Sequence, residues 1–256
     1  SLNTGKCLSV LHGFTKSIVH CSIFSPNGQF IAAACEDGII CIWTIQDALQ
    51  MKPPFFSTFS PKRAPVLWLS FSPGSEFLAY VSEPNCIFVL SISTRRIIDL
   101  KLHTGKVTSV MFSRRLYPTL MGMAPKLLTY SVDDGIVSIS VPNGNTFTPI
   151  HTYKPQISCK KYHIKALTWD SDEHLVIIVR SSNITVFDTI SGNTVTQLPE
   201  IPETFKCYMV AANPKYPCLI AFGSKSGIFS VWDIHNSALL DSYRQSDEFL
   251  YQDLQW

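Results

Sequence analysis

One phrase recurs along this 256-residue chain at a nearly fixed interval. Residues 224–233 read SKSGIFSVWD, which is a short turn, then alternating strand residues, then Trp-Asp. Residues 36–44 read EDGIICIWT, and weaker copies lie at 133–140 and 182–188. The last strand position of each copy falls 45 to 50 residues from the next, at Trp43, Leu90, Ser140, Phe187 and Trp232. A period of this length predicts an array in which each repeat is one supersecondary unit.

Each repeat is predicted to contain four short strands, placed by period-two alternation and by turn residues. The repeats are expected near residues 17–59, 65–102, 106–152, 163–198 and 206–243. In the third repeat, a long loop is expected through Pro118 and Gly122. Two further strands, at residues 6–11 and 250–256, are expected to flank these repeats without completing another one.

The period and the Trp-Asp ending resemble the WD40 repeat family. The resemblance implies an all-β, WD40-type β-propeller with about five blades present. Because a propeller must close and residues 6–11 and 250–256 have no blade, the chain is expected to be an interior part of a seven- or eight-bladed ring. The residues that match the structural positions of the repeat are Asp37, Trp43, His103, Asp134, Phe187, Asp188, Trp232 and Asp233.

The polar network typical of WD40 repeats is incomplete in this sequence. In that family the Trp N–H belongs to a hydrogen-bonded chain through a Ser or Thr, the His of a Gly-His pair, and the Asp of the turn. Gly13-Phe14 replaces the Gly-His pair before the first repeat. The third repeat has His103, but Leu102 precedes it and Ser140 replaces the tryptophan. We therefore expect no repeat to contain the whole set.

Three longer stretches resemble the bromodomain-and-WD-repeat family, at residues 46–65, 102–107 and 210–217. The resemblance covers essentially the whole chain, although no bromodomain lies within it. It implies a non-enzymatic scaffold in the nucleus, in a chromatin-associated transcription regulator that is also linked to cell shape and cytoskeleton organisation. The implied partners are other proteins, such as chromatin-associated or ubiquitin-ligase components.

Two alternatives stay open. One is a cytoplasmic WD40 scaffold for complex assembly, or a substrate receptor of a ubiquitin ligase. Some receptors with this fold end a blade in Trp-Asp-x-Arg, but here Trp232, Asp233 and Ile234 are followed by His235. The other alternative is an enzyme built on a propeller, which would need a convergent set of polar residues that the sequence does not indicate.

Charge indicates protein partners rather than nucleic acid or membranes. The formal net charge is +2, with 21 basic and 19 acidic residues, which is too small for an electrostatic footprint of either kind. Short basic pairs occur in predicted turns and loops, at Lys62-Arg63, Arg95-Arg96, Arg114-Arg115 and Lys160-Lys161. Arginine and aromatic residues are enriched at interface hot spots, so a partner surface is predicted at Arg114, Arg115, Tyr117 and Arg244.

Metal and catalytic chemistry have weak support in the sequence. His151, Cys159 and His163 are close together, but a structural zinc site needs a second close pair of ligands. Asp170 and the two acids that follow it share one turn, which is ordinary turn chemistry. Five of the eight cysteines fall in predicted strands, and neither a signal peptide nor a membrane span is recognised, which favours a reducing compartment. We therefore predict no enzyme activity, no cofactor and no metal.

Overall fold

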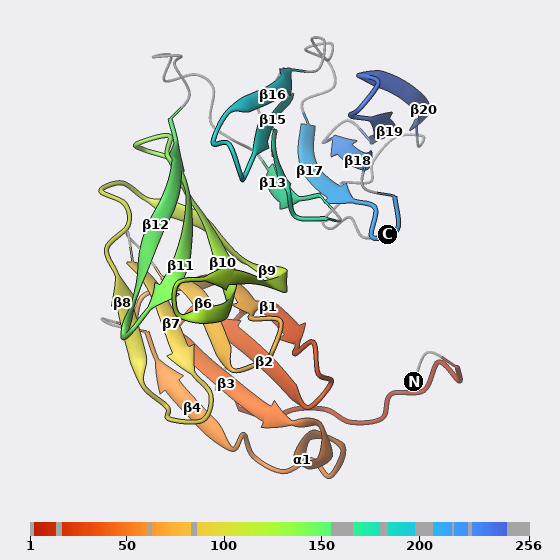
Figure 1. The fold of residues 1–256 in the computed structure, drawn as a ribbon. Coiled ribbons are helices and arrows are strands. Elements are labelled where there is room, and N and C mark those ends of the chain that lie inside the picture. Colours follow the sequence, from red (N-terminus) through yellow and green to blue (C-terminus); the bar gives the residue numbers. More distant parts are fainter. Residues whose placement is uncertain are drawn as a thin grey trace. The chain divides into compact units, whose positions relative to one another are not determined.

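The computed structural model describes residues 3–13, 17–60, 63–82, 86–154, 166–170, 172–179, 184–197, 207–216, 218–224 and 227–244. In this part of the chain the strands form five four-stranded antiparallel sheets, each with its strands ordered as in the sequence (Figure 1). The chain divides into two compact units, residues 1–150 and 151–256. This nearly all-β arrangement of four-stranded antiparallel sheets confirms the predicted all-β fold class and is consistent with WD40 propeller blades.

The first unit carries three of the sheets, and the last strand of the third sheet crosses the unit boundary. The first sheet comprises β1 (Val19–Phe24), β2 (Phe30–Cys35), β3 (Ile39–Thr44) and β4 (Phe56–Phe59). The second comprises β5 (Val66–Phe71), β6 (Phe77–Ser82), β7 (Cys86–Ser91) and β8 (Ile97–Leu100). The third comprises β9 (Val107–Thr119), β10 (Gly122–Ser131), β11 (Val137–Asn143) and β12 (Thr146–Tyr153).

The second unit carries the other two sheets. The fourth sheet comprises β13 (Ala166–Trp169), β14 (Leu175–Val179), β15 (Ile184–Asp188) and β16 (Thr194–Gln197). The fifth comprises β17 (Cys207–Ala212), β18 (Leu219–Ser224), β19 (Ile228–Asp233) and β20 (Ala238–Arg244). The predicted strand at 250–256 lies outside the described residues.

One short helix interrupts the first repeat. Helix α1 (Ile45–Leu49) connects β3 to β4. Thr44 caps its N-terminus, because the hydroxyl accepts a hydrogen bond from Asp47 N–H at 3.0 Å. In the described residues, no helix is long and apolar enough to cross a membrane.

The residues before β1 do not form the predicted strand. Residues 6–11 have no strand pairing, and β4 already completes the four-stranded sheet of this repeat. The segment is instead held by side chains. Ser9 donates its hydroxyl proton to the Ala48 carbonyl, and Leu11 packs against the buried cluster that contains Trp43.

Apolar side chains of neighbouring sheets pack together within each unit. In the first unit, Ile40 and Ile42 of β3 share a buried cluster with Leu78 and Tyr80 of β6. In the second unit, one cluster joins the fourth and fifth sheets through β14 and β15 on one side and β18 and β19 on the other. Burial between repeats, rather than within a single sheet, therefore stabilises the fold.

Four inner strands share a further irregularity that marks them as copies of one repeat. In β1, β5 and β17 the register with the next strand shifts two residues into the strand, at Val19/Cys21, Val66/Trp68 and Cys207/Met209. The pairing of β9 with β10 shifts at the corresponding end, between Tyr130 and Ser131. A β-bulge at one fixed position is a property of the repeat and not a local defect.

A side-chain oxygen closes the turn between the inner strand and the second strand. In three repeats it accepts a hydrogen bond from the backbone N–H five residues later. The pairs are Ser25 with Phe30, Ser72 with Phe77, and Asp170 with Leu175, at 2.9 to 3.0 Å. The first residue of each pair also bonds through its backbone N–H to the carbonyl of the second. This turn is therefore a fixed element of the repeat.

Candidate functional site

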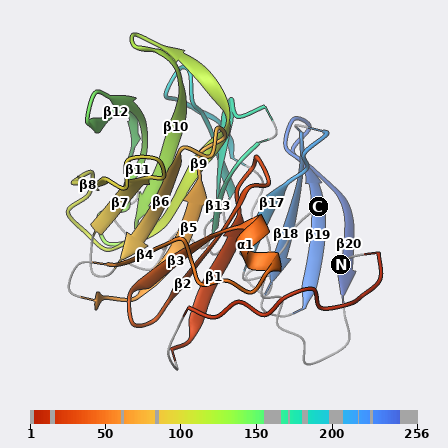
Figure 2. The ribbon, with the colours of Figure 1, turned by 90° about the horizontal axis from the view of Figure 1, so that it is seen from below.

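The third repeat departs from this plan in one respect. Ser113 occupies the turn-closing position, but its hydroxyl accepts a hydrogen bond from Lys126 N–H, thirteen residues later, at 2.8 Å. The connection is thus eight residues longer than in the other three repeats. The extra residues form an extension of the hairpin of β9 and β10, which rises past the neighbouring strands in Figure 2. The loop predicted through Pro118 and Gly122 is wrong, because these residues pair across the hairpin.

Ser113 marks the base of the extension. Leu127 pairs with Phe112 and Pro125 with Leu116, so three residues of β9 lie opposite the single residue Lys126. The Ser113 hydroxyl replaces the missing ladder contacts by donating to the Arg115 carbonyl at 2.8 Å while it accepts from Lys126 N–H. A bulge of this kind bends a strand and changes the direction of the residues after it. The extension is therefore an ordered projection from an otherwise regular repeat.

Apolar side chains are exposed at the end of this projection. Leu120 is fully exposed, Met121 is 75% exposed and Met123 is 62% exposed. Isolated exposed apolar residues are normal, but a contiguous group on a projecting element indicates an interaction site. The sequence signal that could have shown the site is the run of residues 116–123, which has strand-forming and apolar residues but no acidic residue.

Three residues of the predicted partner surface lie on the same hairpin. Arg114, Arg115 and Tyr117 belong to β9, so their predicted loop location is wrong. Both arginines are exposed. The buried Lys126 places its ammonium 3.9 Å from the centre of the Tyr117 ring, a cation–π contact that fixes the ring to the hairpin.

The fourth predicted residue, Arg244, lies in the other unit. It ends β20, an exposed outer strand in which Arg244 pairs with Ile228. Tyr243, its neighbour, is also exposed and has its ring 6.5 Å from that of Phe229.

A second polar cluster, inside the third repeat, is structural. The side chain of His103 is buried, with its Nε2 2.8 Å from the Thr129 hydroxyl and its Nδ1 3.6 Å from a carboxylate oxygen of Asp134. A proton on Nδ1 suits the nearby carboxylate, and Nε2 then faces the Thr129 hydroxyl, which also lies 3.4 Å from the Ser138 carbonyl. The third repeat therefore contains the His, Thr and Asp of the WD40 network, while Ser140 is buried at the tryptophan position.

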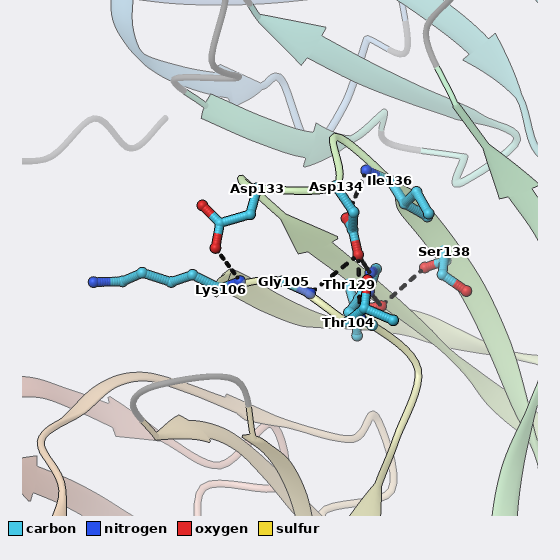
Figure 3. A network of polar contacts seen from close by, with 9 residues as sticks. Thr104, Gly105, Lys106, Thr129, Asp133, Asp134, Ile136 and Ser138 are labelled. Atoms are coloured by element: carbon cyan, nitrogen blue, oxygen red, sulfur yellow. Dashed lines mark hydrogen bonds and ion pairs between the residues drawn. The ribbon is translucent and has the colours of Figure 1, made fainter. Parts of the chain in front are cut away.

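The same aspartate ties two connections together, as Figure 3 shows. Asp134 accepts hydrogen bonds from the backbone N–H groups of Thr104 and Gly105, at 3.2 and 3.4 Å, and from Ile136 N–H at 3.0 Å. Its neighbour Asp133 accepts from Lys106 N–H at 2.7 Å. These bonds hold residues 104–106, which precede β9, against the turn between β10 and β11.

The ionisation of this pair follows from its surroundings. Burial lowers the pKa of His103, although the Asp134 carboxylate opposes that shift. Burial alone would raise the pKa of Asp134, but the hydrogen bond from Ile136 N–H and the nearby Ser131, His103 and Thr104 lower it. We therefore assign a neutral imidazole facing a charged carboxylate near neutral pH. This pair positions the connections on either side of it.

The aromatic positions of the repeat are buried as core residues. Trp43 is 1% exposed and packs with Ala33, Cys41 and Ala48. Trp232 is also buried, and its indole N–H donates to the Ser230 hydroxyl at 3.1 Å. Phe187 is buried, with its ring 4.9 Å from that of Tyr153.

The remaining acidic positions of the repeat support turns. Asp37 accepts from Ile39 N–H at 3.2 Å and contacts the Cys35 thiol. Asp188 accepts from Ile190 N–H at 2.7 Å. Asp233 accepts from His235 N–H at 2.9 Å, and the carboxylate also binds Asn236. Each carboxylate therefore satisfies backbone N–H groups next to its own strand.

The groups weighed for metal or catalytic chemistry are dispersed. His151 lies in β12, whereas Cys159 and His163 lie outside the described residues. Asp170 is buried and closes a turn, and Glu173 lies in the left-handed region with φ 61°. Within the described ranges, no three His, Cys, Asp or Glu side chains are grouped so that they could hold a metal ion.

Comparison with known proteins adds a family assignment for part of the chain. Residues 5–44, which end with β3, match the family model for the WD domain, G-beta repeat. The chain is 30% identical over 106 residues to cleavage stimulation factor subunit 50 of Arabidopsis thaliana, covering 38% of this chain and 25% of that protein. It is 41% identical over 54 residues to WD repeat-containing protein AAC3 of Dictyostelium discoideum, covering 21% and 11%.

The matched regions span a quarter or less of these two curated relatives. Together with the four-stranded sheets, the matches support the WD40 repeat family. They do not bear on the finer resemblance to the bromodomain-and-WD-repeat family.

Proposed function

We propose that the chain is a non-enzymatic scaffold that binds other proteins. The observation that carries the proposal is the extended β9–β10 hairpin, which adds an ordered, apolar projection to a repeat that does not need it for closure. WD domains typically bind other proteins, and the polar network of this chain is engaged in holding strands. Exposed apolar residues on an ordered element suit binding of a protein surface more than turnover of a small substrate.

The finer biological setting rests on the sequence resemblance. We place the scaffold in the nucleus, within a chromatin-associated regulator of transcription that is also linked to cell shape and cytoskeleton organisation. A seven- or eight-bladed ring, completed by further repeats, is part of this proposal. The parent coding sequence tests both points, because it shows the number of repeats and whether bromodomains follow.

The alternative settings are a cytoplasmic scaffold for complex assembly and a ubiquitin-ligase substrate receptor. The receptor motif lacks its arginine, since His235 stands in the following position. His235 is exposed, and its backbone N–H is bonded to Asp233. Imaging of the tagged full-length protein separates nuclear from cytoplasmic placement.

Affinity purification tests the scaffold proposal. The tagged chain is compared with a variant in which residues 114–125 are replaced by a two-residue Asn-Gly turn, which suits a tight hairpin. We expect a reproducible set of proteins to be retained by the chain and depleted with the shortened hairpin, while both proteins unfold at similar temperatures. If the folded chain retains no protein above a tag-only control, the scaffold proposal is wrong.

A further inference from the structure

The hairpin extension has one apolar face. In the antiparallel register, Leu116 lies opposite Pro125 and Pro118 lies opposite Met123. Directly opposed residues, and residues two apart on one strand, project from the same side of a hairpin. Leu116 and Met123 are 40% and 62% exposed, so this side presents apolar surface to solvent.

The tip is fixed before any partner binds. Thr119 pairs with Gly122 across a two-residue turn, and its hydroxyl donates to the Gly122 carbonyl at 2.7 Å. The same hydroxyl accepts from Met121 N–H at 3.2 Å. Leu120 and Met121 are therefore held on a defined turn. A preorganised element loses less conformational entropy on binding than a flexible loop does.

The charge of the hairpin is one-sided. Residues 107–131 contain Arg114, Arg115 and Lys126 but no Asp or Glu, whereas the whole chain has nearly balanced charge. Arg114 and Arg115 are both exposed on β9. The electrostatic complement of this surface is therefore a negatively charged partner.

We infer that the β9–β10 hairpin docks an acidic protein segment whose large apolar side chains contact Leu120, Met121 and Met123 while its carboxylates face Arg114 and Arg115. The inference rests on the proposed scaffold function and specifies its partner class. An anionic membrane surface fits this hairpin less well than an acidic protein segment does. Recognition of anionic lipid typically uses four to eight clustered basic residues, and this hairpin exposes two arginines.

Selection from a displayed library of random twelve-residue peptides tests the inference on the intact 256-residue chain. The tip variant carries Leu120→Asp and Met121→Asp, and the charge variant carries Arg114→Glu and Arg115→Glu. The matched control is Leu239→Asp, because Leu239 is exposed to 49% on β20 in the other unit. Leu120 and Met121 are exposed, so the tip variant is expected to keep the thermal unfolding midpoint of the parent.

The expected result is enrichment of peptides that combine large apolar residues with Asp or Glu. A synthetic copy of an enriched peptide should bind the tip variant about tenfold or more weakly than the parent chain. It should also bind the charge variant more weakly, and it should bind the control with unchanged affinity. An empty selection, enrichment of peptides without acidic residues, or affinity that survives the tip substitutions would overturn the inference. Vesicles of phosphatidylcholine and phosphatidylserine are the second probe, and binding to them that is lost in the tip variant would also overturn it. If any of these outcomes overturns the inference, the scaffold proposal still holds provided that the affinity purification retains proteins independently of the hairpin.

Discussion

Ser113 accepts a hydrogen bond from the backbone N–H of Lys126 at 2.8 Å and so closes the base of the extended hairpin. Ser25 and Ser72, at the same position of their own repeats, accept the equivalent bond across a tight turn. The bond from Lys126 to Ser113 is buried at both ends. The extended hairpin is therefore an insertion into a standard turn of the repeat, with the closing device of that turn retained.

Ser113→Ala is expected to destabilise the fold by about 1–3 kcal/mol, because it leaves the buried Lys126 N–H and the Arg115 carbonyl without this partner. Chemical denaturation measures the change. Ser242→Ala is the matched control, since Ser242 is exposed on β20, and it should change stability by less than about 0.5 kcal/mol. Equal effects of the two substitutions would show that Ser113 does not support the hairpin base.

His103→Gln is expected to flatten the dependence of stability on pH. The pKa of His103 is lowered by burial in the folded protein, so the unfolded chain takes up the proton first as pH falls below about 6.5. Stability contributed by the neutral imidazole is therefore lost on acidification, at no more than about 1.4 kcal/mol per pH unit for one proton. Urea midpoints between pH 7.5 and 5 measure this, and identical slopes in the two proteins would contradict the assigned neutral state. The lowered pKa of Asp134 adds a stabilising contribution that is lost only at more acidic pH, below the pH range of the urea midpoints.

Trp232→Ala is expected to destabilise the fold by about 3–5 kcal/mol, the usual range for removing a buried aromatic side chain. Trp232 belongs to the cluster that joins the fourth and fifth sheets, so its loss also weakens packing between repeats. Leu239→Ala, at an exposed position of the same sheet, serves as the control. A urea midpoint that does not move in the Trp232 variant would show that the indole is not part of the core.

Gly13→Ala is expected to destabilise the first repeat by about 1–3 kcal/mol. A Cβ at Gly13 would lie 2.8 Å from Cζ2 of Trp43, which is buried and cannot yield easily. Gly74→Ala is the matched control, because the added Cβ would meet only the flexible end of Glu76. Thermal unfolding of the two variants compares the positions directly, and a stable Gly13 variant would mean that residues before β1 do not pack on Trp43.

The repeat plan could be predicted from the sequence because each strand carries its own signal. The apolar run from Ile39 to Trp43 predicts a buried strand, and the structure buries both of its faces. Gly38, with φ 79°, supplies the turn before it. The outer strands β8 and β12 had no comparable signal, since an outer strand buries few side chains and its sequence is correspondingly less restricted. The prediction of a strand at residues 6–11 is wrong for a related reason, because alternation in an expected edge strand does not specify a pairing partner.

The candidate site could be predicted only in part. Arg114, Arg115 and Tyr117 were identified by residue type, which is enriched at interfaces, but not by conformation. Pro118 and Gly122 indicated a loop, because a proline has no N–H for a ladder and a glycine favours turns. Ser113, thirteen residues from its partner, determines that the segment is a closed hairpin, and no local pattern shows a contact over that distance.

Binding of protein through the β9–β10 hairpin can be observed by hydrogen exchange. Backbone amide exchange of the 256-residue chain would be measured by mass spectrometry alone and with a saturating selected acidic peptide. We expect slower exchange in fragments that cover residues 113–126, with little change in β20, because the partner covers the tip and stabilises the ladder between Leu116 and Pro125. Protection confined to other strands, with exchange at residues 113–126 unchanged, would contradict binding through this hairpin.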